Sequence, residues 1–149
     1  MSILTQKTIS KKISVEGIGI HTGLKVKLDI FPAQPNTGII FKRVDVKKNN
    51  IIIPAYNNVI DATLCTTISN DFGIKVSTIE HLMGAFYGLG IDNAIVELNS
   101  QEVPIMDGSA KEFVKLILEA GFQNSEAPIK LIKIEKEVEV IEGNKKISI

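Results

Sequence analysis

The sequence predicts an α+β fold, in which a mainly antiparallel sheet carries two helices packed on one face. Three observations support this class. As far as about residue 70, β-branched residues alternate with polar residues between short turn clusters, which is typical of half-buried strands. Two later segments begin with a helix-start signal and stop at glycine. Strand-like alternation then returns near the end of the chain, so we also expect the first strands of a second, similar domain.

Length and composition are typical of a soluble globular domain and exclude several functional classes. The chain has 149 residues, of which 44% are hydrophobic and 23% charged, and its 17 basic and 17 acidic side chains give a formal net charge of zero. A neutral chain lacks the basic surface that binding to nucleic acid or to an anionic membrane requires. The longest uncharged apolar stretch, residues 82–91, is too short to span a bilayer. We therefore expect no nucleic-acid partner and no integral membrane segment.

Cysteine content and the N-terminus favour a cytoplasmic location. Cys65 is the one cysteine of the sequence, so the chain cannot form an internal disulfide. Residues 1–12 contain no apolar core of the kind found in secretory signal peptides. Both features are typical of a cytoplasmic protein.

Strand patterns dominate the first half of the chain. In residues 25–31, the apolar side chains Val26, Leu28 and Ile30 alternate with charged ones, as in a strand with one buried face. Residues 8–15 show a similar alternation. The other expected elements are a strand at 63–69, a turn at 70–73 and two short apolar runs at 39–41 and 51–53. We expect the two short runs to form a small extra hairpin or sheet.

A glycine-rich loop separates the first two expected strands. It contains Gly17, Gly19 and Gly23, and His21 lies between the last two of them. Glycine permits a tight turn, and it also permits the backbone to approach a ligand closely. The loop is therefore a candidate binding loop.

Two helices follow, and each begins with a Ser-x-x-Glu capping box, in which serine and glutamate side chains satisfy free backbone N–H groups. The pairs are Ser77 with Glu80, and Ser109 with Glu112. The first helix is expected over residues 78–87, stopped by Gly88 and Gly90. The second has one apolar face, as a helix packed on a sheet requires, and ends at Gly121. Between them, the apolar segment 94–98 predicts an inner strand.

A change of composition predicts a domain boundary near residue 125. Residues 123–128 are polar and include a proline, as a linker does. Beyond them we expect strands at 129–135 and 138–141, with a hairpin turn at 142–145. Residues 1–125 are thus expected to form a first α+β domain that carries the Glu-His pair. Residues 126–149 are expected to form a linker and the opening strands of a truncated second domain.

The sequence has two histidines, His21 and His81, so any imidazole chemistry uses one of these two or a histidine from outside this sequence. Glu80 directly precedes His81, but the expected helix lacks the second histidine of an H-E-x-x-H zinc motif. A catalytic zinc takes three protein ligands and a water molecule. From spacing alone, the simplest interpretation is that Glu80 completes the capping box and that His81 is an ordinary, partly buried helix residue.

Longer motifs in the sequence carry more information than the spacing of Glu80 and His81 alone. Residues 77–82 have the sequence Ser-Thr-Ile-Glu-His-Leu, and residues 88–93 have the sequence Gly-Leu-Gly-Ile-Asp-Asn. They are accompanied by the glycine loop at 17–23, Asp61 with Leu-Cys-Thr at 64–66, and Pro-Ile-Met-Asp-Gly-Ser-Ala at 104–110. In this order, and over nearly the whole chain, the motifs resemble the UDP-3-O-acyl-N-acetylglucosamine deacetylase family, the zinc enzymes of lipid A biosynthesis.

The resemblance implies a hydrolase that removes acetate from a UDP-linked 3-O-acylated N-acetylglucosamine, with Zn²⁺ as cofactor and the free amine as product. It also implies a pair of similar α+β domains that enclose the active site, of which this chain is the N-terminal half. Two further zinc ligands, a histidine and an aspartate, and a histidine general acid are then expected in the missing C-terminal domain. We therefore expect this chain by itself to be inactive. The alternative is a non-catalytic binding module or an inactive fragment of the same fold.

The resemblance assigns roles to the Glu-His pair. Glu80 matches the general base, which takes a proton from the zinc-bound water as that water attacks the acetamide carbonyl, and its capping role stays open beside this one. His81 matches a zinc ligand, and such a ligand needs a carboxylate or carbonyl partner for its second ring nitrogen.

Three further residues are expected in or near the substrate site. His21 either approaches a polar substrate or bonds a backbone carbonyl. Cys65 either lies near the metal or packs as a small hydrophobic residue, which we favour. Thr63 stands where many family members have methionine, and this changes the wall of the pocket.

Overall fold

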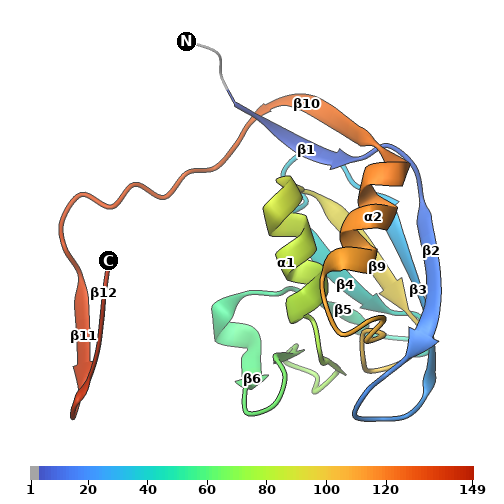
Figure 1. The fold of residues 1–149 in the computed structure, drawn as a ribbon, viewed down its shortest axis with the longest axis horizontal. Helices are drawn as coiled ribbons and strands as arrows, with labels where there is room; N and C mark the ends of the chain where they lie inside the picture. Colours follow the sequence, from blue (N-terminus) through green and yellow to red (C-terminus); the bar gives the residue numbers. More distant parts are fainter. Residues whose placement is uncertain (1–3) are drawn as a thin grey trace.

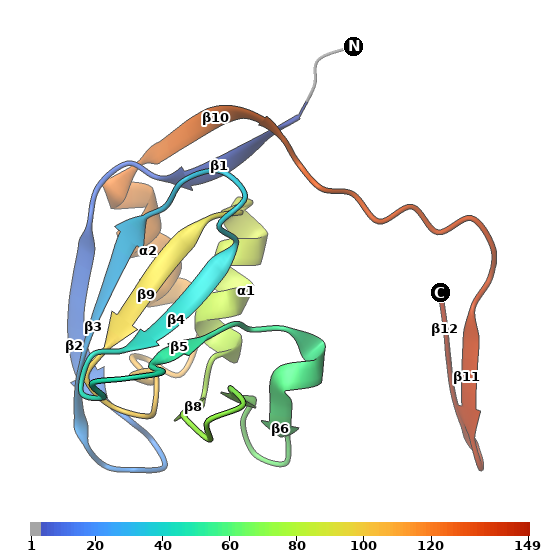
Figure 2. The same ribbon diagram turned by 180° about the vertical axis from the view of Figure 1, so that it is seen from behind.

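The structure is a computed structural model that describes residues 4–149, and it confirms the α+β class. Its main sheet contains β2 (Ile13–Ile18), β3 (Lys25–Pro32), β9 (Ala94–Leu98), β4 (Ile39–Arg43) and β5 (Ile51–Ile52), in this order. Neighbouring strands of this sheet are antiparallel, except that β4 and β9 are parallel. The helices α1 (Glu80–Leu89) and α2 (Lys111–Ala120) cover one face (Figure 1). Figure 2 shows the opposite face, which no helix of the described residues covers.

The core lies between the sheet and the helices. The expected alternation in β3 is confirmed, since Val26, Leu28 and Ile30 are buried and face the helices. The inner strand expected at 94–98 is β9, which lies between β3 and β4. The largest fully buried side chains include Phe41, Phe86 and Phe113, from β4, α1 and α2. Burial of such a side chain stabilises the fold by about 1.5–3 kcal/mol, so these contacts hold the helices on the sheet.

Both helices end at a predicted glycine, but the expected stop at Gly88 is wrong and the first capping box does not form. Helix α1 continues through Gly88 and ends at Gly90, which has a left-handed φ of 67°. Helix α2 ends at Gly121, as expected. Helix α1 begins at Glu80 instead of residue 78, and the Ser77 hydroxyl donates to the Gln101 carbonyl instead of capping the helix. The prediction that Ser77 and Glu80 form a capping box is therefore wrong.

The prediction of a second capping box is also wrong, because α2 begins at Lys111 after Ala110, which makes no side-chain cap. The Ser109 hydroxyl accepts a hydrogen bond from the Lys111 N–H at 3.1 Å, whereas a capping box would bind the N–H of Glu112. In the described chain, Glu112 makes no reciprocal bond to the Ser109 N–H, which donates to the Asp107 carboxylate instead. A nearer acceptor thus replaces the glutamate.

The N-terminal strand is divided, and its first part pairs with the predicted linker. The alternation at 8–15 covers the end of β1 (Thr5–Ile9) and the start of β2, with a break between them. Strand β1 pairs antiparallel with β10 (Phe122–Pro128), so the prediction of an irregular linker at 123–128 is wrong. Backbone pairing does not need apolar side chains, and β10 is mostly exposed. The domain division at residue 125 stays a prediction. The first three residues of the predicted first domain, 1–3, lie outside the described range.

The two short apolar runs are not a separate hairpin. They form β4 and β5, at the edge of the main sheet, where β4 also pairs with β9. A small separate sheet does exist, and it consists of β6 (Val59–Asp61), β7 (Thr67–Ser69) and β8 (Lys75–Val76), preceded by the short helix η1 (Tyr56–Asn58). The strand expected at 63–69 is confirmed for its last three residues, and the turn before Gly73 is present.

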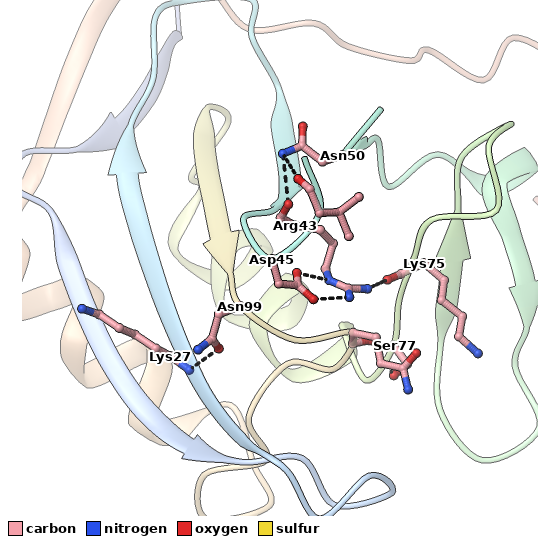
Figure 3. Close-up of polar contacts among 9 residues, drawn as sticks. Lys27, Arg43, Asp45, Asn50, Lys75, Ser77 and Asn99 are labelled. Carbon is pink, nitrogen blue, oxygen red and sulfur yellow. Dashed lines mark hydrogen bonds and ion pairs between the residues drawn. The ribbon is translucent and has the colours of Figure 1, made fainter. Parts of the chain in front are cut away.

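Arg43 joins the main sheet to the small sheet (Figure 3). Its guanidinium binds the Asp45 carboxylate through Nε and Nη2, at 2.8 and 2.6 Å, and donates through Nη1 to the Lys75 carbonyl of β8 at 2.8 Å. The hydrogen bonds from the Arg43 guanidinium to the Asp45 carboxylate lower the pKa of Asp45. Because Lys75 lies two residues before Ser77, the contact fixes the segment that leads into α1.

The C-terminal segment stands apart from the rest of the described chain (Figures 1 and 2). The expected hairpin is present as β11 (Glu139–Glu142) and β12 (Lys145–Ser148), with Gly143 in its turn at a φ of 59°. The strand expected at 129–135 is wrong, because that segment is extended but unpaired. All residues from 130 to 149 are exposed, so they add little apolar burial to the fold.

Across residues 4–149, the helices are too short or too polar to cross a membrane.

Candidate active site

A strained turn directs the chain into α1. The Ser77 N–H donates to the Gln101 carbonyl at 2.9 Å, and the Val103 N–H donates to the Ser77 carbonyl at 3.0 Å. Thr78 follows with a φ of 58°, in the left-handed region that β-branched residues seldom adopt. The Thr78 hydroxyl donates to Glu102 Oε1 at 3.1 Å. The turn places Glu80 and His81 in the first turn of the helix.

Glu80 is held from outside its own helix. Its Oε2 accepts a hydrogen bond from the Thr66 N–H at 3.0 Å. The Ser77 N–H, which a capping glutamate would bind, already donates to Gln101. The capping interpretation of Glu80 is therefore wrong. Within the described chain, Glu80 Oε1 has no hydrogen-bond donor, and the carboxylate sits at the positive end of the helix dipole.

His81 has an unpartnered ring nitrogen. Its Nδ1 is buried and has no hydrogen-bond partner among residues 4–149. Leaving a buried polar atom without a partner costs about 1–3 kcal/mol, so a native fold normally satisfies it. The carboxylate or carbonyl expected to hold one nitrogen of a zinc-binding histidine is not supplied by the described residues. No hydrogen bond at Nδ1 within the described residues therefore competes with a metal ion or with a group from outside this chain.

The loop that holds Glu80 also carries Thr63 and Cys65. Cys65 is partly buried, and its Sγ lies 3.6 Å from the Thr67 hydroxyl. Thr63 is exposed, and its N–H and hydroxyl both donate to Asp61 Oδ1, at 2.9 and 2.8 Å. The bonds from the Thr63 backbone and side chain lower the pKa of Asp61. This loop contacts Glu80 through the Thr66 N–H, one residue after Cys65 and three residues after Thr63, and the place of Thr63 and Cys65 in the site stays a prediction.

His21 is exposed, and its loop contacts a carboxylate of the same chain. The His21 N–H donates to Glu102 Oε1 at 3.0 Å, whereas its imidazole makes no hydrogen bond to the described residues. The alternative in which this imidazole bonds a backbone carbonyl is not observed. A Cβ atom at Gly19 would overlap the Glu102 carboxylate and the Thr22 hydroxyl. Close approach to Glu102 therefore requires a glycine at position 19.

Glu102 is the residue of this region that sequence analysis misses. Its side chain is fully buried, and its carboxylate accepts hydrogen bonds from His21, Thr22 and Thr78. Burial opposes ionisation, but the donors from His21, Thr22 and Thr78 outweigh it and lower the pKa of Glu102. No local signal identifies this residue, because its partners lie 81, 80 and 24 positions away in the sequence.

The described residues do not form a complete metal centre. No three histidine, cysteine, aspartate or glutamate side chains within 4–149 are grouped closely enough to hold a metal ion. The residues present nevertheless fit one part of such a centre, because His81 offers an imidazole and Glu80 a partly free carboxylate beside it. Further ligands would have to come from outside this chain.

Comparisons with known proteins point to one family. Residues 6–149 match the family model described as UDP-3-O-acyl N-acetylglycosamine deacetylase. The chain is 46% identical over 143 residues to the UDP-3-O-acyl-N-acetylglucosamine deacetylase of Haemophilus ducreyi, covering 96% of this chain and 47% of that protein. It is 46% identical to the deacetylase of Shewanella oneidensis and 44% identical to that of Haemophilus influenzae, with the same coverage. The chain thus spans about half the length of the curated relatives it matches.

Proposed function

The chain belongs to the UDP-3-O-acyl N-acetylglycosamine deacetylase family, and from this membership we propose that it forms the N-terminal half of such an enzyme. The reaction is hydrolysis of the acetamide of a UDP-linked 3-O-acylated N-acetylglucosamine, which gives acetate and the free amine in lipid A biosynthesis. One observation carries the proposal. The buried Nδ1 of His81 has no partner in the described chain, and the adjacent Glu80 has a free carboxylate oxygen.

Glu80 acts as the general base. The Thr66 N–H holds its Oε2 and so fixes the orientation of the carboxylate. Its Oε1 is then free to accept a proton from the attacking water as the new C–O bond forms at the acetamide carbon. Because Glu80 lies in the first turn of α1, the helix dipole favours its negative charge before this transfer.

His81 would hold Zn²⁺ as one of its protein ligands. The ion would supply Lewis-acid chemistry, by polarising the carbonyl and lowering the pKa of water. His81 is partly buried, with its Nδ1 shielded from solvent, and a side chain packed in this way suits a fixed ligand. We propose that the other ligands and the general acid belong to the part of the family protein that this chain does not cover. We place His21, Thr63 and Cys65 near the substrate, and none of the three is needed for proton transfer.

The remaining parts of the proposal concern substrate and location. The partner is a UDP-linked acylated amino sugar, as the names of the relatives suggest. Cys65 is the one cysteine of this sequence, so the sequence cannot form an internal disulfide, which favours a cytoplasmic location.

Acetate release tests the proposal. The zinc-loaded full-length protein should release acetate from the UDP-linked substrate, and a chelator should abolish this release. The 149-residue chain should release none under the same conditions, because its described residues do not complete a metal centre. A full-length, zinc-loaded protein without deacetylase activity would contradict the assigned reaction. Activity of the 149-residue chain would contradict the proposal that residues from outside it complete the site.

A further inference from the structure

Glu102 connects two segments that are far apart in the sequence. Its Oε1 accepts the His21 N–H at 3.0 Å and the Thr78 hydroxyl at 3.1 Å. Its Oε2 accepts the N–H and the hydroxyl of Thr22, at 2.9 and 2.7 Å. The side chain is 0% exposed, so these donors replace water around the carboxylate. One buried carboxylate thus binds the glycine loop to the turn before α1.

The turn that Glu102 holds has an unfavourable backbone conformation. Thr78 is 3% exposed and has a φ of 58°, which is unfavourable for a β-branched residue. Such a conformation persists when surrounding contacts impose it. The contacts here are the Thr78 bond to Glu102 and the backbone bonds of Ser77 to Gln101 and Val103. Glu80 follows two residues after Thr78, so the direction of this turn sets where its carboxylate lies.

We propose that Glu102 is a positioning residue of the deacetylase site: by holding Thr78 and the His21 loop together, it sets the start of α1 and hence the positions of Glu80 and His81. The inference rests on the proposed function and deepens it. Glu102 itself acts through Thr78 and the loop, because it is buried and its oxygens are engaged by protein donors.

Glutamine cannot replace Glu102 in this arrangement. Each carboxylate oxygen faces a backbone N–H, from His21 on one side and from Thr22 on the other. A glutamine amide group would therefore point its own N–H donors at a backbone donor in either orientation. The change preserves side-chain size but breaks the link.

The test compares variants in the zinc-loaded full-length enzyme. Glu102→Gln breaks the link from the carboxylate side, and Thr78→Val removes the hydroxyl with little change in shape. Thr78→Ser keeps the hydroxyl and should rescue the defect. Glu97→Gln is the matched control, because Glu97 lies in β9 and pairs with Lys42 at 2.8 Å, away from the Glu102 contacts. For each variant, kcat and KM are measured per zinc-loaded molecule, together with the unfolding temperature and the amide ¹⁵N resonance of Thr66.

We expect kcat to fall about 10- to 100-fold in Glu102→Gln and Thr78→Val, more than KM changes, since small displacements of catalytic groups have effects of this size. Thr78→Ser and Glu97→Gln should retain kcat. The Thr66 resonance should shift in the first two variants, because the Thr66 N–H reports the position of Glu80.

The inference is overturned if Glu102→Gln and Thr78→Val lower the unfolding temperature but leave kcat per zinc-loaded molecule and the Thr66 resonance at the control values. If Glu102→Gln does not fold, the test rests on kcat and the Thr66 resonance of Thr78→Val compared with those of Thr78→Ser. If the unmodified enzyme releases no acetate, the proposed function is wrong. In that case the Thr66 resonance alone decides whether Glu102 positions Glu80: a shift in both variants supports it, and no shift contradicts it.

Discussion

Replacing Glu80 with glutamine separates its catalytic role from its structural one. Glu80 accepts one backbone hydrogen bond, from Thr66 at 3.0 Å, and the glutamine carbonyl can accept the same bond. A charged acceptor contributes about 1.5–3 kcal/mol and a neutral one about 0.5–1.5 kcal/mol, so the free energy of unfolding should fall by about 1 kcal/mol. Glutamine cannot accept the proton of the attacking water. Turnover should therefore fall by about 10²- to 10⁴-fold.

That loss of turnover corresponds to about 2.7–5.4 kcal/mol in the activation barrier, which exceeds the expected loss of stability. The assay is kcat of the zinc-loaded full-length enzyme, with zinc content and urea unfolding measured on the same sample. Glu112→Gln is the control, since Glu112 also lies in the first turn of its helix but outside the candidate site. Unchanged turnover in a stable, zinc-loaded Glu80→Gln variant would refute the general-base role.

Three further predictions concern stability. Asn93→Ala should lower the free energy of unfolding by about 2–4 kcal/mol in urea denaturation, because this 2% exposed residue bonds Gln6 and Gly38; a loss below about 0.5 kcal/mol, as expected for a surface substitution, would contradict it. Burial opposes ionisation of Glu102, but its donors lower the folded-state pKa below the unfolded value, so its stabilising contribution is complete above the ordinary glutamate range and is lost as pH falls through the lowered pKa. In urea denaturation, the free energy of unfolding of Glu102→Gln should accordingly fall less than that of the unmodified protein as pH drops through this acidic range. The same pH dependence in both proteins would contradict the stabilising role of the Glu102 charge. In hydrogen exchange, the amides of β11 and β12 should exchange faster than those of α2, since residues 130–149 are exposed; equal protection would show that the hairpin packs against something.

The segments predicted correctly are those with a strong local burial pattern. The alternation in β3 and the apolar face of α2 each record which side meets the core, so a few neighbouring residues are sufficient. Gly90 and Gly121 are similar, because a left-handed or otherwise unusual φ at a helix end favours glycine whatever surrounds it. The Glu-His pair was recognised from its motif, since spacing alone favoured a capping box.

The errors occur where a polar group has several possible partners. Ser77 and Glu80 have the spacing of a capping box, but Gln101 takes the Ser77 N–H and Thr66 donates to Glu80. The polar segment 123–128 resembles a linker, yet β1 supplies a strand with which it pairs. In both places, local sequence describes the groups available, whereas the partner arrives from a distant part of the chain.

By itself, the sequence determined the α+β class, the apolar face of α2 and the glycines that follow both helices, and its motifs made the Glu80–His81 pair the candidate for chemistry. Only the tertiary structure decided that Thr66 orients Glu80, that His81 Nδ1 is left without a partner in the described chain, and that Glu102 lies beneath the glycine loop. The physical reason is the distance along the sequence over which the interacting residues are separated. Apolar periodicity depends on neighbours along the chain, but each buried N–H or carboxylate must be satisfied by whichever group the fold brings to it.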